Sequence, residues 1–106
     1  MAKFLVQATY SAEGLRGLQR EKASGRREAV TRTVEALGGK VESLYFSLGD
    51  YDVLLTIDVP DIVTGTALAV AVSASGLVRS RTTPLLSVEE VDRALSMAVE
   101  YRPPRA

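Results

Sequence analysis

Hydrophobic and polar residues alternate along four segments of the chain, and a period of two is typical of half-buried β-strands. In residues 53–59, for example, every odd-numbered position is Val, Leu or Ile. A short segment containing Gly49-Asp50 separates the second and third of these segments, so we expect them to form an antiparallel hairpin. The pattern predicts strands at residues 3–10, 41–48, 53–59 and 77–86.

Three other segments have helical spacing or helix-capping residues. Several glycines interrupt the first, so we expect a short helix at 13–20, a bend at 23–25 and a firmer helix at 26–37 that ends at Gly38-Gly39. The second helix, at 62–74, follows Pro60-Asp61 and is apolar or small on nearly every side. Ser87-Val88-Glu89-Glu90 is a capping box that opens a last, amphipathic helix.

This order of elements predicts the fold class. A β-α-β-β-α-β order with right-handed crossovers indicates an α+β, ferredoxin-like sandwich, here with an extra C-terminal helix. We expect one domain over residues 1–100 and a loose tail at 101–106, which contains Pro103-Pro104. An all-round apolar second helix and a sheet face without helices favour a homo-oligomer, at least a dimer.

Composition excludes several kinds of chemistry. The 106 residues include thirteen basic and thirteen acidic ones, a balance that argues against a nucleic-acid partner. The chain has no Cys and no His, which removes disulfides, thiolate nucleophiles, the Ser-His-Asp triad and a haem with an axial histidine. The spacing of Asp50, Asp52 and Asp58 matches no known metal-binding loop, so we expect no metal and no cofactor.

Two observations bear on localisation. Gln7 interrupts the first apolar run too early for a signal peptide. Residues 62–74, the most apolar segment, are shorter than the ~20 residues that a membrane crossing needs. We therefore expect a cytoplasmic protein without a membrane partner.

The hairpin segment Phe46-Ser47-Leu48-Gly49-Asp50-Tyr51-Asp52-Val53-Leu54-Leu55 resembles the signature of the GYD domain family, aromatic-x-x-Gly-x-Tyr-Asp-hydrophobic. Asp50 occupies the variable position, and the similarity extends over about residues 3–86. The resemblance implies a small protein of the dimeric α/β-barrel type, without a settled biochemical activity. The hairpin and topology are also similar, more weakly, to the effector domains of leucine-responsive (feast/famine) regulators, which bind amino acids between subunits.

Six residues are candidates for binding a ligand. Tyr10 ends the first strand where a helix begins, a corner that can hold an anion. Basic side chains on the first helix and the fourth strand could bind a carboxylate or phosphate. Asp52 either caps backbone N–H groups of the turn or accepts a hydrogen bond or proton in a pocket that Tyr51 shapes. The candidates are Tyr10, Lys22, Arg26, Tyr51, Asp52 and Arg79.

Charge is also unevenly distributed along the chain. Residues 16–32 contain six basic and two acidic side chains, and residues 50–61 contain four aspartates and no base. These segments either form solvated faces or meet across a subunit interface.

Three functions remain open at this point. The first, which the absence of histidine favours, is an oligomer that binds or senses a small anionic or aromatic ligand in a pocket near the hairpin. The second is a cofactor-independent isomerase or oxygenase of the dimeric α/β-barrel type, using Asp52, Tyr51, Tyr10 and an oxyanion-binding Arg or Lys. The third is a structural assembly protein, which needs no pocket.

Overall fold

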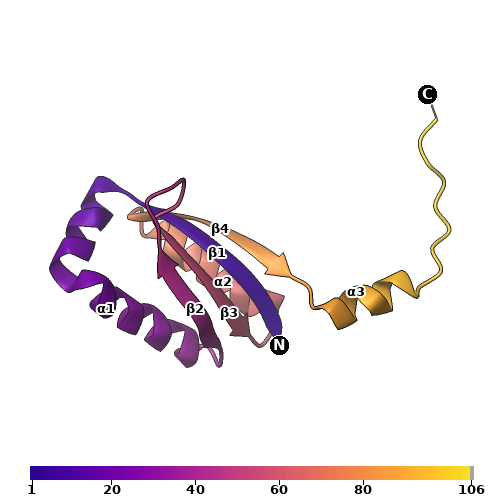
Figure 1. Cartoon of the computed structure of the whole chain (residues 1–106), viewed down its shortest axis with the longest axis horizontal. Coiled ribbons are helices and arrows are strands. Elements are labelled where there is room, and N and C mark those ends of the chain that lie inside the picture. The colour runs from indigo at the N-terminus through magenta and orange to yellow at the C-terminus, as the bar shows by residue number, and fades with distance from the viewer. Residues whose placement is uncertain (106) are drawn as a thin grey trace.

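Seven helices and strands make up residues 1–105, the part of the chain that the computed structural model describes. Their order is the predicted βαββαβ with one further helix, and their ends lie within about two residues of the predicted ones (Figure 1). The elements are β1 (Ala2–Tyr10), α1 (Ala12–Ala36), β2 (Lys40–Phe46), β3 (Val53–Val59), α2 (Ile62–Ala74), β4 (Val78–Leu85) and α3 (Val88–Leu95).

The four strands form one antiparallel sheet in the order β2-β3-β1-β4. Val6 of β1 lies between Leu55 of β3 and Thr82 of β4. Pro84 is on the edge strand β4, where a missing N–H removes no bond to a further strand. On one face of this sheet, α1 lies over β2 and α2 lies over β4, so the α+β, ferredoxin-like prediction is confirmed (Figure 1).

Side-chain caps fix where the three helices begin, and the capping box of the last helix agrees with the sequence prediction. The Ser11 hydroxyl accepts a 3.1 Å hydrogen bond from the N–H of Gly14 at the start of α1. Asp61 Oδ1 accepts a 2.8 Å bond from the N–H of Thr64 in α2. At α3, Ser87 and Glu90 form the reciprocal capping box, with bonds of 3.1 and 2.8 Å.

The bend in α1 lies at Lys22, one residue before the predicted 23–25 segment. Lys22 has φ 68° and ψ 169°, a conformation that only glycine adopts without strain. The first part of α1 is tied to the start of β4, where the Ser11 N–H donates to the Leu77 carbonyl at 2.8 Å. The second part runs along β2, so the chain changes direction between these two attachments. Lys22 and Arg26 are four residues apart and could share a helix face only if the bend permitted it, and the bend at Lys22 separates them.

The packed core lies at the end of the sheet where β1 begins. It consists of aliphatic and aromatic side chains from β1, β3 and α1: Phe4, Val34, Leu55, Ile57 and Val59. Gly65 allows α2 to approach the sheet closely, because a Cβ there would fall 2.5 Å from Cε2 of Phe4. The core therefore closes one end of the space between helices and sheet.

The opposite face of the sheet carries the odd-numbered residues of β1, and we call it the outer sheet face. On it, Leu5 pairs with Thr56, Gln7 pairs with Leu54, and Lys3 pairs with Asp58. The Lys3 amine also forms an ion pair with the carboxylate of Glu42 from β2. Apolar side chains and charges of both signs are therefore mixed on this face.

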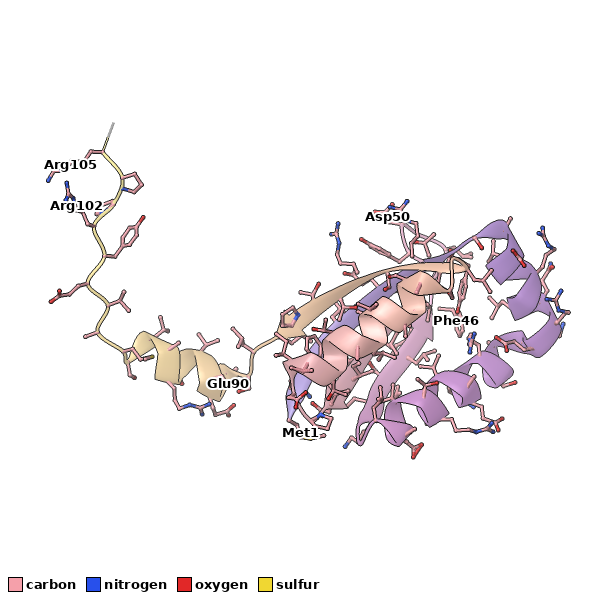
Figure 2. The ribbon with its side chains drawn as sticks, turned by 180° about the vertical axis from the view of Figure 1, so that it is seen from behind. Met1, Phe46, Asp50, Glu90, Arg102 and Arg105 are labelled. Atoms are coloured by element: carbon pink, nitrogen blue, oxygen red, sulfur yellow. The ribbon has the colours of Figure 1, made fainter. Side chains whose placement is uncertain are left out.

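Helix α3 and the segment after it extend away from the sheet (Figures 1 and 2). Figure 2 shows Glu90 on α3 and Asp50 on the hairpin at opposite sides of the molecule. The predicted apolar stripe of α3 is present but exposed, with Val88 at 74% and Leu95 at 77%. Among residues 1–105, none of the helices combines the length and the hydropathy that a bilayer crossing requires.

Candidate functional site

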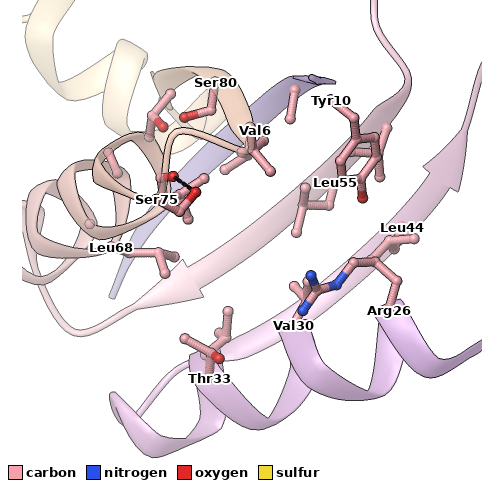
Figure 3. Close-up of a pocket in the computed structure, with 18 residues that line it drawn as sticks. Val6, Tyr10, Arg26, Val30, Thr33, Leu44, Leu55, Leu68, Ser75 and Ser80 are labelled. Atoms are coloured by element: carbon pink, nitrogen blue, oxygen red, sulfur yellow. Dashed lines mark hydrogen bonds between the residues drawn. The ribbon is translucent and has the colours of Figure 1, made fainter. Parts of the chain in front are cut away.

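A cavity of about 250 Å³ lies between α1, α2 and the inner face of the sheet (Figure 3). Its walls are largely aliphatic. Thr33 of α1 and Ser75 at the end of α2 line it and are exposed, so the cavity opens to the surface between the two helices. The apolar lining residues are Val6, Ala8, Val30, Val34, Leu44, Val53, Leu55, Leu68, Ala69, Val72 and Val78.

Short side chains on the sheet and on α2 account for this hollow. Ala8 of β1, Ser80 and Thr82 of β4, and Gly65 and Ala69 of α2 all face it. Helix α1 lies over the edge strand β2 and α2 over the edge strand β4, so the space between the helices lies over the middle of the sheet. The inward-facing Ser80 and Thr82 were a detectable sequence signal of an underpacked layer, although the sequence pattern alone did not lead us to a cavity here.

Arg26 brings a positive charge into the cavity. Figure 3 shows its side chain extending from α1 into the space, near Val30 and below Leu55. Its Nε is buried and lies 3.3 Å from Oε1 of Glu21, across the kink at Lys22. The direction of that contact does not meet hydrogen-bond geometry, so Nε is without a hydrogen-bond partner among residues 1–105.

Tyr10 contributes a phenol to the same cavity. Burial is the main cause that raises the pKa of Tyr10 above its ordinary value of 10.0. The Arg26 charge opposes this rise in pKa, whereas the carboxylates of Glu21 and Asp52 add to it. At neutral pH Tyr10 is therefore an uncharged hydroxyl that can donate a hydrogen bond.

Asp52 fixes the position of Tyr10. Its carboxylate accepts a 2.9 Å hydrogen bond from the backbone N–H of Tyr10, in the neighbouring strand. Its own N–H donates to the carbonyl of Ala8 at 2.8 Å, and its carbonyl accepts from the N–H of Ser47 at 2.9 Å. Asp52 thus caps the end of β1 rather than the N–H groups of the turn, which corrects one of our two interpretations. It does not line the cavity.

The remaining candidates lie apart from Tyr10 and Arg26. Lys22 is exposed at the kink, and Tyr51 is half-buried on the hairpin. Arg79 pairs with Thr9, whereas Tyr10 pairs with Val78, so Arg79 is on the outer sheet face, opposite the cavity. Of the six predicted residues, the structure brings Tyr10 and Arg26 together at the cavity. It adds Glu21, which the sequence analysis did not single out.

A cluster of opposite charges lies on the outer sheet face. Lys3 contacts Glu42 and lies 3.7 Å from Asp58. The hydrogen bond from Lys3 is the main cause that lowers the pKa of Glu42, and a hydrogen bond with Glu42 is the main cause that raises the pKa of Asp58. Within residues 1–105, no three acidic side chains come together in a group that could hold a metal ion.

Comparison with known proteins identifies the family. The model of the GYD domain matches residues 4–95, which span β1 to the end of α3 and include the Gly49-Asp50-Tyr51-Asp52 hairpin. No curated protein and no solved structure matches the chain. Because the match covers most of the sequence and agrees with the resemblance of the hairpin, the chain belongs to the GYD domain family.

Proposed function

We propose that this protein binds or senses a small ligand in the cavity between its helices and its sheet. The observation that carries the proposal is an apolar, surface-connected space with a few convergent polar groups, the usual form of a small-molecule site. Tyr10 and Arg26 provide those groups at one end. A fully packed interior would instead have favoured a purely structural role.

Backbone strain next to the cavity supports the proposal. Lys22 is the non-glycine residue with positive φ in residues 1–105, and it lies between Glu21 and the helical segment that carries Arg26. Strained backbone persists where the surrounding structure enforces it, and it clusters at ligand sites and switch regions. A ligand that contacts Arg26 would act directly on this kink.

Binding is favoured over catalysis by the position of Asp52. A cofactor-independent enzyme on this fold would use Asp52, Tyr51 and Tyr10 around one substrate. The Asp52 carboxylate is occupied by the N–H of Tyr10 instead, and neither Asp52 nor Tyr51 lines the cavity. The cavity therefore offers a cation and a phenol for binding, without a carboxylate base among its lining residues in the described part of the chain.

The protein is further proposed to assemble with a second copy of itself through the outer sheet face. Leu5 and Leu54 form an apolar centre there, and basic and acidic side chains surround it. A surface with both signs of charge can be complementary to itself across a two-fold axis. Light scattering should give at least a dimer, and Leu54→Glu should shift it towards monomer. Leu48→Glu, on the exposed hairpin, is the control, and a monomeric wild type would contradict the assembly proposal.

The ligand-binding proposal is tested by a thermal-shift screen with two matched variants. Carboxylic acids, amino acids, nucleotides and phenols are titrated against the wild-type protein, because a ligand of the native state raises the melting temperature by mass action. Ala69→Leu fills the cavity, and Ala67→Leu makes the same change on the exposed side of α2. A saturable shift that Ala69→Leu abolishes and Ala67→Leu preserves is expected. No shift with any class, or a shift that survives in Ala69→Leu, would refute the proposal.

A further inference from the structure

The cavity has a single sign of charge. Among its lining residues in the described part of the chain, Arg26 is the one with a charged side chain, and the other polar side-chain groups are hydroxyls of Tyr10, Thr33, Ser75, Ser80 and Thr82. A cation in an apolar space loses hydration and is stabilised there by an anion that also accepts its hydrogen bonds. The electrostatics of the cavity therefore favour an anionic ligand.

The hydrogen-bond donors of the Arg26 guanidinium are only partly satisfied within the protein. Glu21 Oε1 lies 3.3 Å from Arg26 Nε but off the direction of the N–H, so a buried donor remains without an acceptor. An unsatisfied buried donor is costly, and an acceptor placed along its N–H recovers that cost. The Glu21 side chain is 36% exposed, so it can turn into solvent when another carboxylate takes its place.

We propose that the ligand is a monocarboxylate with a compact apolar body, whose carboxylate pairs with the Arg26 guanidinium in place of Glu21. This inference rests on the proposed function and names its ligand class. The planar guanidinium presents parallel N–H groups that match the two oxygens of a carboxylate. The Tyr10 hydroxyl is a second donor at the same end, and the apolar body packs against Val30, Leu55 and Leu68.

Charge and volume both favour a monocarboxylate over a phosphate ester or nucleotide. One arginine balances one negative charge, and a phosphate dianion would leave the second charge buried among aliphatic side chains. The cavity volume of 250 Å³ corresponds to about eight water-sized groups, at the roughly 30 Å³ that one water occupies in the liquid. Six-carbon acids and small benzoates are of that size.

The proposal is tested by calorimetric titration of the full chain with two acids and their amides. Hexanoate is compared with hexanamide, and 4-methylbenzoate with 4-methylbenzamide, because each amide keeps the shape and removes the charge. Each acid should bind the wild type at least about tenfold more tightly than its amide, the size of a charge-assisted pair. Glu21→Gln should tighten binding of the acid and leave the amide unchanged, because the competing carboxylate is gone.

Variants of Arg26 separate the charge from the shape of the cavity. Arg26→Met should bring the affinity for the acid down to that for the amide, and Arg26→Lys should keep a smaller preference because its ammonium lacks the planar fork. Arg27→Met, on an exposed neighbouring residue, is the control and should retain the full preference. Circular dichroism verifies that each variant is folded. If Arg26→Met does not fold, the comparison of Arg26→Lys with the wild type still tests the role of the guanidinium.

The outcomes distinguish this proposal from the one on which it depends. Equal binding of acid and amide, unaltered by Arg26→Met, overturns the monocarboxylate assignment and leaves the ligand-binding function standing. The assignment is also overturned if neither acid binds. The thermal-shift screen with other ligand classes, and its Ala69→Leu variant, then decides the ligand-binding function separately.

Discussion

The carboxylate of Asp52 accepts a 2.9 Å hydrogen bond from the backbone N–H of Tyr10, and this bond joins the signature hairpin to the end of β1. Tyr10 in turn places its phenol in the cavity beside Arg26. The hairpin that identifies the family therefore acts on the cavity by positioning a neighbouring strand. Its own Tyr51 and Asp52 stay outside the lining.

Removing the Asp52 carboxylate should destabilise the fold. Asp52→Ala leaves the half-buried N–H of Tyr10 without its acceptor, a loss of about 1–3 kcal/mol in the free energy of unfolding by urea. Asp52→Asn keeps a carbonyl oxygen as acceptor and should remain folded with a smaller loss. Asp50→Ala, on the exposed side of the same hairpin, should have little effect. Equal stability of Asp52→Ala and wild type would show that the bond does not hold the hairpin.

A glycine at position 22 should stabilise the protein. Lys22→Gly relieves a left-handed backbone conformation that glycine adopts freely, so unfolding should cost about 1 kcal/mol more than in the wild type. Arg27→Gly, in the regular part of α1, should instead lose about 1 kcal/mol, the usual penalty for glycine inside a helix. A loss of stability in both variants would mean that the kink is not strained.

The cap of α2 makes stability depend on pH. The hydrogen bond from the Thr64 N–H is the main cause that lowers the pKa of Asp61 below its ordinary value of 3.8. A lowered pKa in the folded state contributes stability above pH 3.8, and that contribution is lost as the pH falls through the folded-state pKa. The wild type should therefore have a higher melting temperature than Asp61→Ala at pH 7, and this difference in melting temperature should shrink as the pH approaches 3. A difference that does not change with pH would exclude the charged cap.

The phenol of Tyr10 should ionise at a higher pH than a free tyrosine, because its pKa is raised above the ordinary value of 10.0. In an alkaline titration followed by tyrosinate absorbance, part of the absorbance change of the wild type should occur at higher pH than the rest. Tyr10→Phe should lack this late component. Because the folded-state pKa is raised, the stability that the neutral phenol contributes is complete below pH 10 and is lost as the pH rises through the folded value. Tyr45→Phe changes a ring that is 72% exposed and should leave the late component in place. Persistence of that component in Tyr10→Phe would assign it to another residue.

The fold could be predicted from the sequence because its signals are local. Alternation along residues 53–59 places Val53, Leu55, Ile57 and Val59 on the buried face, and all four are buried. Ser11, Asp61 and Ser87 are capping residues at the three positions where helices begin. Each of these features depends on residues a few positions apart, so one sequence suffices to find them.

The site was harder to predict from the sequence than the fold, because its residues come together only through the packing of elements that are distant in the sequence. Register decides that Tyr10 faces the helices and that Arg79, next to Val78 on β4, faces the other side of the sheet. The strained kink moved Lys22 out of line with Arg26 and brought Glu21 beside it. Strand register sets the first result and the attachment of α1 at its two ends sets the second, so both depend on the packing of elements that are distant in the sequence.

Methyl NMR spectroscopy of the full chain with hexanoate shows where on the protein a ligand binds, and so whether the cavity between helices and sheet is the site. Binding in the cavity should cause saturable shifts for the methyl groups of Val6, Val30 and Leu68, which line it. The methyl groups of Val88 and Leu95 on α3, which are exposed away from it, should not shift. Shifts confined to α3 or to Leu5 and Leu54 of the outer sheet face would contradict a ligand site in the cavity, whereas no shifts at all would overturn the monocarboxylate assignment.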